Sequence, residues 1–594
     1  MKYLRYLTAA IVIMAFGACT SMDQYPEDSI SPETYFGSES ELRQYTNAFY
    51  TLMPEMSTYL WYEQNSELVI KNLPSPELLG TRALPSKASE VGWTWTTLRD
   101  INYFLQHSHR CSDQEVRDHY DGVAYFFRAF FYYKMLVKFG EVPLYDEPIG
   151  SDDQTMLCKP RDSRDDVINH ILEDCDRAYE LLPKAHNATE VCAWTALALK
   201  SRAALFEGTF RKYHDGDPFN KDHLKSEDLL KICAEASKLL MDKGGYSLHT
   251  AGSLPYREMF YSSTADDKEY IWARIATESA GKMHNANDAS LTRGISLSKR
   301  FVSLYLKTDG SRFTDNPDWK TMGYLDECKD RDPRMSQTVL CPGYKQKGSA
   351  ALSFTNFTST KGGYQFIKYV AEAAQNGYDH CKSALPIFRL AEVYLNYAEA
   401  LAELGSLTQA DLDNSVNKLR KRVKMPDLKL VEANQNPDPF LMSEEWGYPN
   451  VTKSDNTGVI LEIRRERLIE LALENNHYDD ILRWKEGKVY EKPFYGMYFP
   501  GPGKYDMTGD GRDNICLYEG KKPSGSGLKF FQIGKDIILS EGNHGFTIRN
   551  SEPGLERNWT ETRDYLYGIP TNERILTGGV LTQNPGWDDK LTFN

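Results

Sequence analysis

Apolar positions recur every three or four residues along most of the chain, the spacing that gathers them on one face of an α-helix. The stretch from Asp165 to Leu182 shows this stripe, with Ser163 placed to cap its start and Pro183 just after its end. The stretch from Gly122 to Phe139 is apolar nearly all round, which predicts a central helix that stops at Gly140. The same pattern predicts helices over 190–208, 227–242, 387–404, 409–423 and 460–486. The chain is therefore predicted to be mainly α.

Two of the predicted helices share a texture in which alanine alternates with large residues. The segments "AWTALALKSRAALFEG" and "RLAEVYLNYAEALAELG" interleave Ala with Leu, Phe or Tyr and end in Gly. Small residues let a neighbouring helix approach closely, as in tetratricopeptide-like (TPR-like) hairpins. The long stretches between the helices are rich in Gly, Pro, Asn and Asp, and we expect function there. They cover 210–224, 308–363, 425–459 and 495–556.

The N-terminus carries the marks of an export signal. Lys2 and Arg5 precede an apolar run over 7–16, which is too short to cross a bilayer. The residues Phe-Gly-Ala before Cys19 resemble a bacterial lipobox, which predicts removal of 1–18 and lipidation of Cys19. Several acyl chains on one residue would hold the protein stably on a membrane. An ordinary cleaved signal with an incidental cysteine is the alternative.

Charge and cysteine spacing narrow the classes of partner and cofactor. The formal net charge of −14 argues against nucleic acid, because phosphate binding needs clustered positive charge. The ten cysteines stand singly, with no Cys-x-x-Cys pair of the kind that holds zinc or performs thiol exchange. We expect no required cofactor.

A series of motifs resembles the SusD/RagB outer-membrane lipoproteins. The similar segments occur in the expected order across nearly the whole mature chain. They are "DSISPETYFGSESELRQYTNAFY", "WTWTTLRDINYFL", "AYFFRAFFYYKMLVKFGEVPLY", "KDRDPRM", "RLAEVYLNYAEALAEL" with "VNKLRKRV", "RRERLIELALENNHYDDILRW", "RDYLYGIPTNERI" and "LTQNPGW". The chain departs from the family pattern at Val123 and Gly568.

The resemblance implies a SusD-like α-helical fold with TPR-like hairpins and long irregular loops that carry minor β-structure. It implies a lipidated tether over 19–35 and a SusD-like domain over 36–594, with an N-terminal part at 36–215 and a C-terminal part at 270–594. Such proteins lie on the outer face of the outer membrane of Bacteroidetes-type bacteria. They capture a glycan, less often a peptide, and cap a SusC-like TonB-dependent transporter. These are the implied function, location and partners.

An enzyme is the alternative function, for example a secreted glycoside hydrolase of the same pathway. The chain has no His-Glu-x-x-His, Gly-x-Ser-x-Gly or P-loop pattern. A glycosidase needs two carboxylates at a set separation, which 84 acidic residues neither show nor exclude. In "LEIRRERLIELALE" the acids alternate with Arg at helical spacing, which favours structural ion pairs. A peptide-binding RagB-like lipoprotein would share the scaffold and differ in its loops.

One loop has the chemistry of a calcium site. In "DMTGDGRDN", Asp506, Thr508, Asp510 and Gly511 occupy positions 1, 3, 5 and 6 of a calcium-loop pattern. The twelfth position is Leu517 instead of the bidentate Glu. The pattern leaves open a structural calcium ion and a metal-free Asp/Gly turn.

Aromatic faces are the surfaces on which sugar rings stack, and amide or charged groups bind their hydroxyls. Trp194, Trp484, Trp587 and Trp95 fall in helices or motifs and are assigned to the scaffold. Other aromatic residues lie in polar or Gly/Pro-bounded stretches, where they bind ligand or serve as buried loop residues. The candidate ligand-binding residues are Trp61, Tyr62, Arg82, Trp93, Trp319 and Tyr324.

Overall fold

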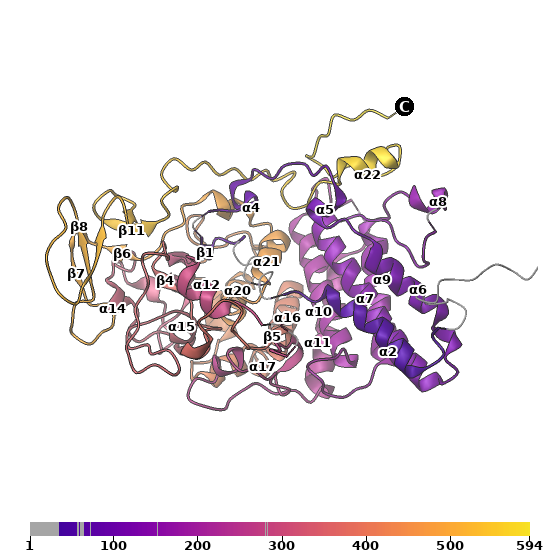
Figure 1. Cartoon of the computed structure of the whole chain (residues 1–594), viewed down its shortest axis with the longest axis horizontal. Helices are drawn as coiled ribbons and strands as arrows, with labels where there is room; N and C mark the ends of the chain where they lie inside the picture. Colours follow the sequence, from indigo (N-terminus) through magenta and orange to yellow (C-terminus); the bar gives the residue numbers. More distant parts are fainter. Residues whose placement is uncertain are drawn as a thin grey trace, which may run out of the picture.

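The structure is a computed structural model that describes residues 35–55, 59, 65–71, 73–150, 152–221, 223–279, 281 and 283–593. Its scaffold is a row of long helices in which each packs against the next (Figure 1). Helix α7 contacts α9, α9 contacts α10, α10 contacts α11, α11 contacts α16 and α16 contacts α20. These packed neighbours include α10 and α16, the two helices predicted to be TPR-like, and the mainly α prediction is confirmed.

The helices have the following bounds. They are α2 Glu39–Asn47, α4 Pro76–Leu79, α5 Ala88–Val91, α6 Thr96–His107, α7 Gln114–Phe139, α8 Gln154–Leu157, α9 Arg164–Leu181, α10 Ala193–Tyr213, α11 Ser226–Lys243, α12 Ala286–Thr292, α13 Lys299–Leu304, α14 Tyr324–Glu327, α15 Pro333–Thr338, α16 Leu390–Leu404, α17 Gln409–Asn414, α18 Val416–Arg422, α19 Leu430–Gln435, α20 Thr457–Glu470, α21 His477–Trp484 and α22 Thr571–Leu576.

The strands are short and form small sheets. They are β1 Val69–Ile70, β2 Tyr270–Arg274, β3 Ser296–Leu297, β4 Tyr364–Gln365, β5 Leu385–Arg389, β6 Tyr498–Phe499, β7 Gly503–Tyr505, β8 Ile515–Tyr518, β9 Lys529–Gln532, β10 Ile538–Leu539 and β11 Gly545–Ile548. The strand orders are β1-β3-β4, β10-β11-β6, β2-β5 and β7-β8-β9. Sheet β7-β8-β9 lies at the end of the molecule opposite α7 and α9 (Figure 1).

Local signals in the sequence set several helix ends. The Ser163 hydroxyl accepts a hydrogen bond from the Asp166 amide at 3.1 Å, which caps α9 as predicted. Helix α7 ends at Gly140, as predicted, but begins earlier than the apolar run, at a cap formed by Asp113. The polar first turns of α7 carry no strong apolar signal, so the hydrophobic pattern alone missed them.

The helix predicted over 460–486 is two helices. Helix α20 ends at Glu470 and α21 begins at His477, and between them Leu473 and Asn475 have positive φ. The broken turn leaves carbonyl groups without helical partners. Lys368 Nζ donates to the Ala472 carbonyl at 2.7 Å, and Tyr369 Oη donates to the Leu473 carbonyl at 3.0 Å. Tertiary hydrogen bonds therefore stabilise a break that helical periodicity did not predict.

Two other predicted helices also change. The first residues of 387–404 belong to strand β5, which pairs antiparallel with β2, and the helix begins at Leu390. The helix predicted over 409–423 splits at Ser415 into α17 and α18. In both cases the apolar pattern continues across the change, because the residues on either side of it are buried in the same core.

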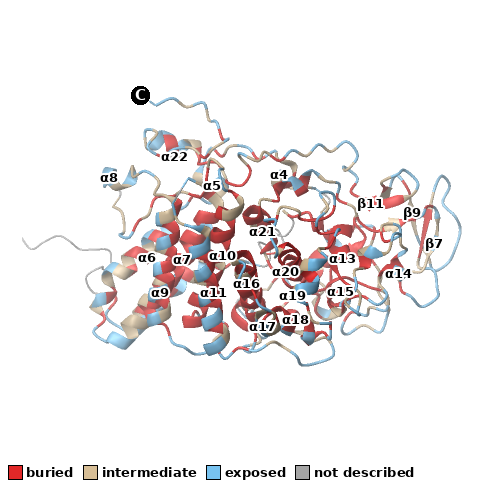
Figure 2. Cartoon of the chain, turned by 180° about the vertical axis from the view of Figure 1, so that it is seen from behind, coloured by how far each residue is buried: buried red, intermediate tan, exposed pale blue. Residues whose placement is uncertain are grey.

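The core is continuous from the N-terminal to the C-terminal segments. Buried apolar side chains from Phe36 to Leu581 form one cluster. Figure 2 shows the burial concentrated in α10, α16, α20 and α21. The chain after 560 packs back onto the first part, where the Thr571 and Asn572 amides donate to the Pro85 and Ser86 carbonyls. Within the described residues, no helix has the length and apolar character needed to cross a membrane.

Candidate ligand-binding site

The structure buries Trp93, against our prediction of a ligand-stacking ring. Its side chain is 3% exposed and packs edge-on against Phe139 and Trp95, with ring centroids 4.9 Å and 5.3 Å away. Trp95, which we assigned to the scaffold, is only partly buried. The short segment after α5 folds inward and places Trp93 in the core.

Trp319 and Tyr324 are also buried, so their predicted exposure is wrong. Trp319 is 8% exposed and lies edge-on to Phe440 and Trp446, with centroids 5.6 Å and 5.0 Å away. The Tyr324 hydroxyl donates to the Leu340 carbonyl inside the protein. Both serve as apolar fillers beneath the loops that contain them. No face of either ring is free for a sugar.

Arg82 joins an N-terminal segment to the C-terminal segment around Asp564 and does not face solvent. Its Nη2 lies 3.1 Å from Asp564 Oδ1, and both side chains are buried. The guanidinium also lies 4.4 Å from the ring centroid of Tyr567 and 5.5 Å from that of Trp587. The prediction that Arg82 binds ligand hydroxyls is wrong, because the side chain is buried and its Nη2 donates to Asp564.

Trp61, Tyr62 and Cys19 lie outside the described residues. Their assignments to ligand binding and lipidation stay predictions.

The loop that resembles a calcium site joins β7 to β8. Asp506 Oδ1 accepts from the Thr508 and Gly509 amides at 2.9 and 2.7 Å, and Oδ2 accepts from the Gly511 amide at 2.8 Å. Burial alone would raise the pKa of Asp506, but these amide donors lower it. The Thr508 hydroxyl donates to Asp510 Oδ1 at 3.0 Å. The loop is thus hydrogen-bonded within itself, and calcium binding stays a prediction.

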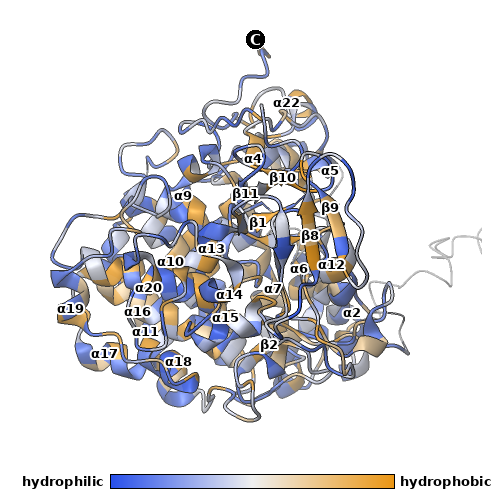
Figure 3. Ribbon diagram, turned by 90° about the vertical axis from the view of Figure 1, so that its left-hand side faces the viewer, coloured by the Kyte–Doolittle hydropathy of each residue, from blue (hydrophilic) through white to orange (hydrophobic). Residues whose placement is uncertain are grey.

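A pocket of about 340 Å³ has Leu291 of α12 and Lys529 of β9 among its lining residues. Both elements are labelled in the end view of Figure 3. This volume is at the lower end of the range typical of small-molecule sites. Most of its lining comes from the 308–363 stretch, one of the stretches in which we expected function, and from 365–370. The lining residues are Leu291, Leu340, Tyr344, Gln346, Leu352, Ser353, Phe354, Asn356, Gln365, Ile367, Val370 and Lys529.

The floor of the pocket is a small apolar cluster separate from the main core. Leu340, Ile367 and Val370 form this cluster, and the partly buried ring of Tyr344 packs against it. Backbone hydrogen bonds join the 338–340 and 365–367 segments beneath it, including Leu340 N to the Gln365 carbonyl at 2.8 Å. The floor is therefore made of buried apolar side chains on two hydrogen-bonded segments.

Arg257 fixes the position of Tyr344. Its Nε donates to the Ile367 carbonyl and its Nη2 to the Val370 carbonyl, each at 2.9 Å. The same Nη2 lies 3.1 Å from the Tyr344 hydroxyl, to which it donates. The hydroxyl keeps its own hydrogen for a further acceptor. The aromatic ring is thus held before any ligand arrives.

The lining includes a second aromatic ring, Phe354. Three residues further on, Phe357 is 1% exposed and packs edge-on against Phe531 and Phe499, at 5.6 and 5.8 Å between centroids. Phe357 thereby ties the 351–360 loop to the strands beyond it. Phe354 remains partly exposed within the pocket.

The polar lining is partly committed to the fold. The Gln346 amide group donates to the Ala371 carbonyl at 2.9 Å and to Asn376 Oδ1 at 2.7 Å. Asn356 Nδ2 donates to the Leu291 carbonyl at 3.2 Å. The same lining therefore holds two half-buried aromatic rings together with amide groups, the residue types that complement the apolar faces and hydroxyls of a sugar ring. The sequence-based candidates, which centred on Trp and its neighbours, did not include Tyr344 or Phe354.

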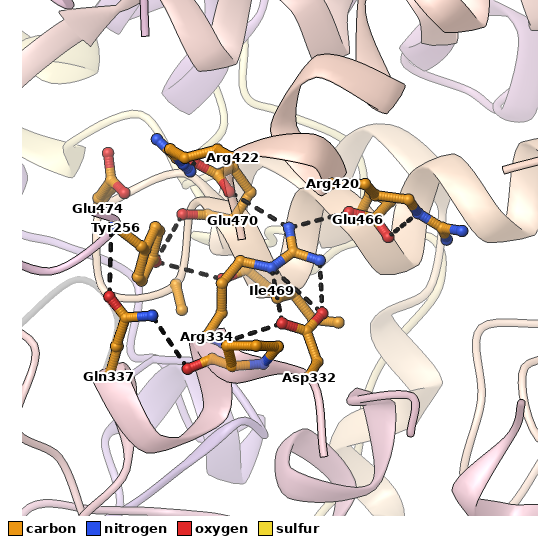
Figure 4. Close-up of polar contacts among 12 residues, drawn as sticks. Tyr256, Asp332, Arg334, Gln337, Arg420, Arg422, Glu466, Ile469, Glu470 and Glu474 are labelled. Atoms are coloured by element: carbon orange, nitrogen blue, oxygen red, sulfur yellow. Dashed lines mark hydrogen bonds and ion pairs between the residues drawn. The ribbon is translucent and has the colours of Figure 1, made fainter. Parts of the chain in front are cut away.

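The Arg and Glu residues of the 460–486 region form a buried ionic network, as their spacing predicted. Arg334 contacts Glu466 at 2.9 Å, Glu470 at 3.3 Å and Asp332 at 2.6 Å (Figure 4). Burial alone would raise the pKa of Glu470, but Arg422, Arg389 and Arg334 hold it well below its ordinary value. These carboxylates are ionised and paired, which is a structural arrangement and not an acid/base one.

The network is balanced in charge. Among the described residues it connects seven carboxylates to seven cations, and all of them are buried except Arg312, which is half-buried. The carboxylates are Glu269, Asp332, Asp438, Glu462, Glu466, Glu470 and Glu474, and the cations are Arg312, Arg334, Lys368, Arg389, Arg420, Arg422 and Arg465. Opposite charges in equal number offset the cost of removing each from water.

The scaffold is thus a set of packed helices, and a pocket of about 340 Å³ lies outside its main core. The chain belongs to the SusD family, whose sequence profile matches residues 258–587. A second profile, described as "Starch-binding associating with outer membrane", matches residues 93–205. The family assignment made from the motifs is confirmed.

Named relatives and solved structures agree with this assignment. The SusD-like protein P2 of Formosa agariphila is 22% identical over 510 residues, which cover 81% of this chain and 90% of the relative. A SusD-like carbohydrate binding protein of Bacteroides fragilis superposes with a TM-score of 0.69 at 20% identity, over 91% of this chain and 99% of the other. A second SusD-like protein of that species gives 0.67 at 20% identity, over 95% and 100%. These superpositions establish the shared fold.

Proposed function

We propose that this protein is a cell-surface glycan-binding lipoprotein. It captures an oligo- or polysaccharide and delivers it to a SusC-like TonB-dependent transporter in the outer membrane. Membership of the SusD family supports this function, as do the carbohydrate-binding description of one structural neighbour and the outer-membrane association in the second profile's description. The lipobox before Cys19 supports attachment through a lipid.

The observation that carries the proposal is the presence of two aromatic rings, Tyr344 and Phe354, in the lining of the pocket. Tyr344 is held in place by Arg257, and Phe354 stands on a loop tied down by Phe357. A sugar ring stacked on one such face buries modest apolar area, which stabilises the complex by on the order of 1–2 kcal/mol. Two such contacts, less the cost of ordering a flexible glycan, give affinities of roughly micromolar to millimolar.

The lining favours capture over hydrolysis. Of the twelve described residues that line the pocket, none is Asp or Glu. A glycosidase of the usual kind needs two carboxylates flanking the scissile bond. The buried Glu residues of α20 are held by Arg side chains and do not reach this pocket's lining. We therefore propose binding without cleavage.

The test is titration calorimetry of the purified protein with a panel of polysaccharides, followed by the variant Phe354→Ala. Loss of one stacked ring should weaken binding of the best ligand about tenfold. The matched control is Phe530→Ala, which removes a partly buried ring outside the lining and should leave affinity unchanged. Equal affinity for wild type and Phe354→Ala would exclude this pocket. Release of new reducing ends by the wild-type protein would contradict the binding function.

A further inference from the structure

The chain segments that build the pocket are basic in a protein that is acidic overall. Residues 333–371 contain five Lys or Arg residues and no Asp or Glu, and residues 520–535 contain four Lys and no acid. The whole chain carries a formal charge of −14. The two segments meet at this pocket, because the 340–370 region forms its floor and one wall while Lys529 lines another side.

Not all of these cations are available to a ligand. Arg334 and Lys368 belong to the buried ionic network. Lys361 Nζ lies 3.2 Å from the Asp536 carbonyl oxygen, to which it donates. Lys345 and Lys347, on either side of Gln346, are exposed. Neither lysine lines the pocket, and Lys347 Nζ lies 5.4 Å from the ring centroid of Tyr261.

Lys529 is the one charged residue among the lining residues. It is exposed, it begins the edge strand β9, and its backbone amide donates to the Asn514 carbonyl at 2.9 Å. Its Nζ lies 5.1 Å from the ring centroid of Phe354. No carboxylate of the described chain forms an ion pair with it. The strand therefore fixes its backbone while its ammonium group stays available beside an aromatic face.

The nearest acid on α12 is already paired. Asp288 Oδ2 lies 2.6 Å from Arg293 Nε, and its Oδ1 accepts from the Thr292 hydroxyl. Asp536, beyond β9, accepts from the Gln532 amide at 2.8 Å. A negative charge that enters the pocket thus meets an unpaired ammonium and no uncommitted carboxylate in the lining. An ammonium close to a low-dielectric wall interacts with an anion more strongly than it would in bulk water.

We propose that the pocket selects an acidic glycan. The carboxylate of a uronic acid or the sulfate of a sulfated sugar pairs with Lys529, while the sugar ring contacts Phe354 and Tyr344. Both anions present oxygen acceptors to the ammonium donors, so the shared chemistry is an anionic sugar substituent. This inference rests on the proposed glycan-binding function and names its class of ligand.

The first experiment compares matched charged and uncharged ligands on the wild-type protein. Oligogalacturonate and its fully methyl-esterified form share one backbone and differ in charge, and dextran sulfate and dextran do the same for sulfate. A wider array of neutral, uronic acid and sulfated polysaccharides is screened alongside. We expect the strongest binder to be acidic, and the uronate and sulfate arms identify which anion is used. A neutral polysaccharide as the strongest binder would overturn the inference but leave glycan binding intact.

The second experiment tests Lys529 itself on that strongest binder. Lys529→Gln should weaken binding about tenfold at 50 mM NaCl and by less than about threefold at 500 mM, because salt screens the lost attraction. Lys535→Gln removes an exposed lysine of the same region that does not line the pocket, and should change affinity by less than about twofold. Equal effects of the two substitutions would contradict the role of Lys529. Absence of binding to every polysaccharide would instead contradict the proposed function.

Discussion

Arg389 and Glu470 form a fully buried ion pair that joins strand β5 to helix α20. Arg389 Nη1 lies 2.8 Å from Glu470 Oε1, and the side chains are 1% and 0% exposed. Glu470 also contacts Arg422 at 2.5 Å and Arg334 at 3.3 Å. One carboxylate thus holds three arginines from three different segments. Through Arg334, Glu470 also links α20 to α15, and Leu340 of the segment that follows α15 lines the pocket.

The first prediction concerns this carboxylate. Glu470→Gln should lower the free energy of unfolding by about 3–5 kcal/mol, because it leaves buried arginines without their shared counter-charge. The control is Asp326→Asn, which makes the same chemical change in the exposed Asp326–Lys329 pair and should leave the unfolding midpoint nearly unchanged. Urea unfolding followed by circular dichroism measures both. Equal losses would show that burial of the network does not matter to stability.

The second prediction concerns pH. Burial raises the pKa of Glu486 to about 8 from 4.5, against the opposing effect of Arg464. The folded state therefore keeps a proton that the unfolded state releases above pH 4.5. The contribution of this proton to the free energy of unfolding is present in full below pH 4.5. It is lost as the pH rises to about 8.

Glu486→Gln removes this titration. Relative to wild type, the variant should gain roughly 1 kcal/mol of stability per pH unit between pH 5 and 8, and no more above that range. The amide keeps a carbonyl oxygen for the Asn450 amide, which donates to Glu486 Oε1 at 2.7 Å in the wild type. Urea unfolding at a series of pH values measures the difference. Parallel stability curves for the two proteins would refute the raised pKa.

The third prediction separates the core tryptophan from the binding rings. Trp319→Ala should destabilise the protein by about 3–5 kcal/mol, because it empties a space packed by Phe440 and Trp446. Glycan affinity of the folded fraction should not change. Phe354→Ala should weaken glycan binding and leave the stability of the fold nearly unchanged. Calorimetric titration and thermal melting on the same samples decide, and a weakened ligand complex without destabilisation in Trp319→Ala would restore our original assignment.

The fourth prediction concerns attachment to the membrane. Cys19→Ala should move the protein from the membrane fraction to the soluble fraction, because the acyl chains have no other residue to join. The fold should be intact, as judged by an unchanged circular dichroism spectrum. Cys158→Ala, at a half-buried cysteine of the mature chain, is the control and should leave the protein with the membrane. Retention of Cys19→Ala in membranes after carbonate washing would exclude lipid attachment at this position.

Most of the long helices could be predicted from the sequence because their signals are local. The stripe and cap of α9 and the Gly140 stop of α7 depend on residues within a few turns of one another. The alternation of Glu and Arg in α20 likewise indicated ion pairs before any partner was known. The break after Glu470 was not accessible, because Lys368 and Tyr369 stabilise it from a hundred residues away in the chain.

By itself the sequence determined the helical scaffold and the family, because periodicity and ordered motifs are read along the chain. Its charged-then-apolar start predicts an export signal. Only the tertiary structure decided which aromatic rings are buried and which are partly exposed. Trp93 and Trp319 lie in loop-like sequence yet fill the core, whereas Tyr344 and Phe354 reach the surface beside Lys529. Exposure depends on what packs over a residue, and here the covering segments come from distant parts of the chain. The composition of a segment does not show which distant segments pack over it.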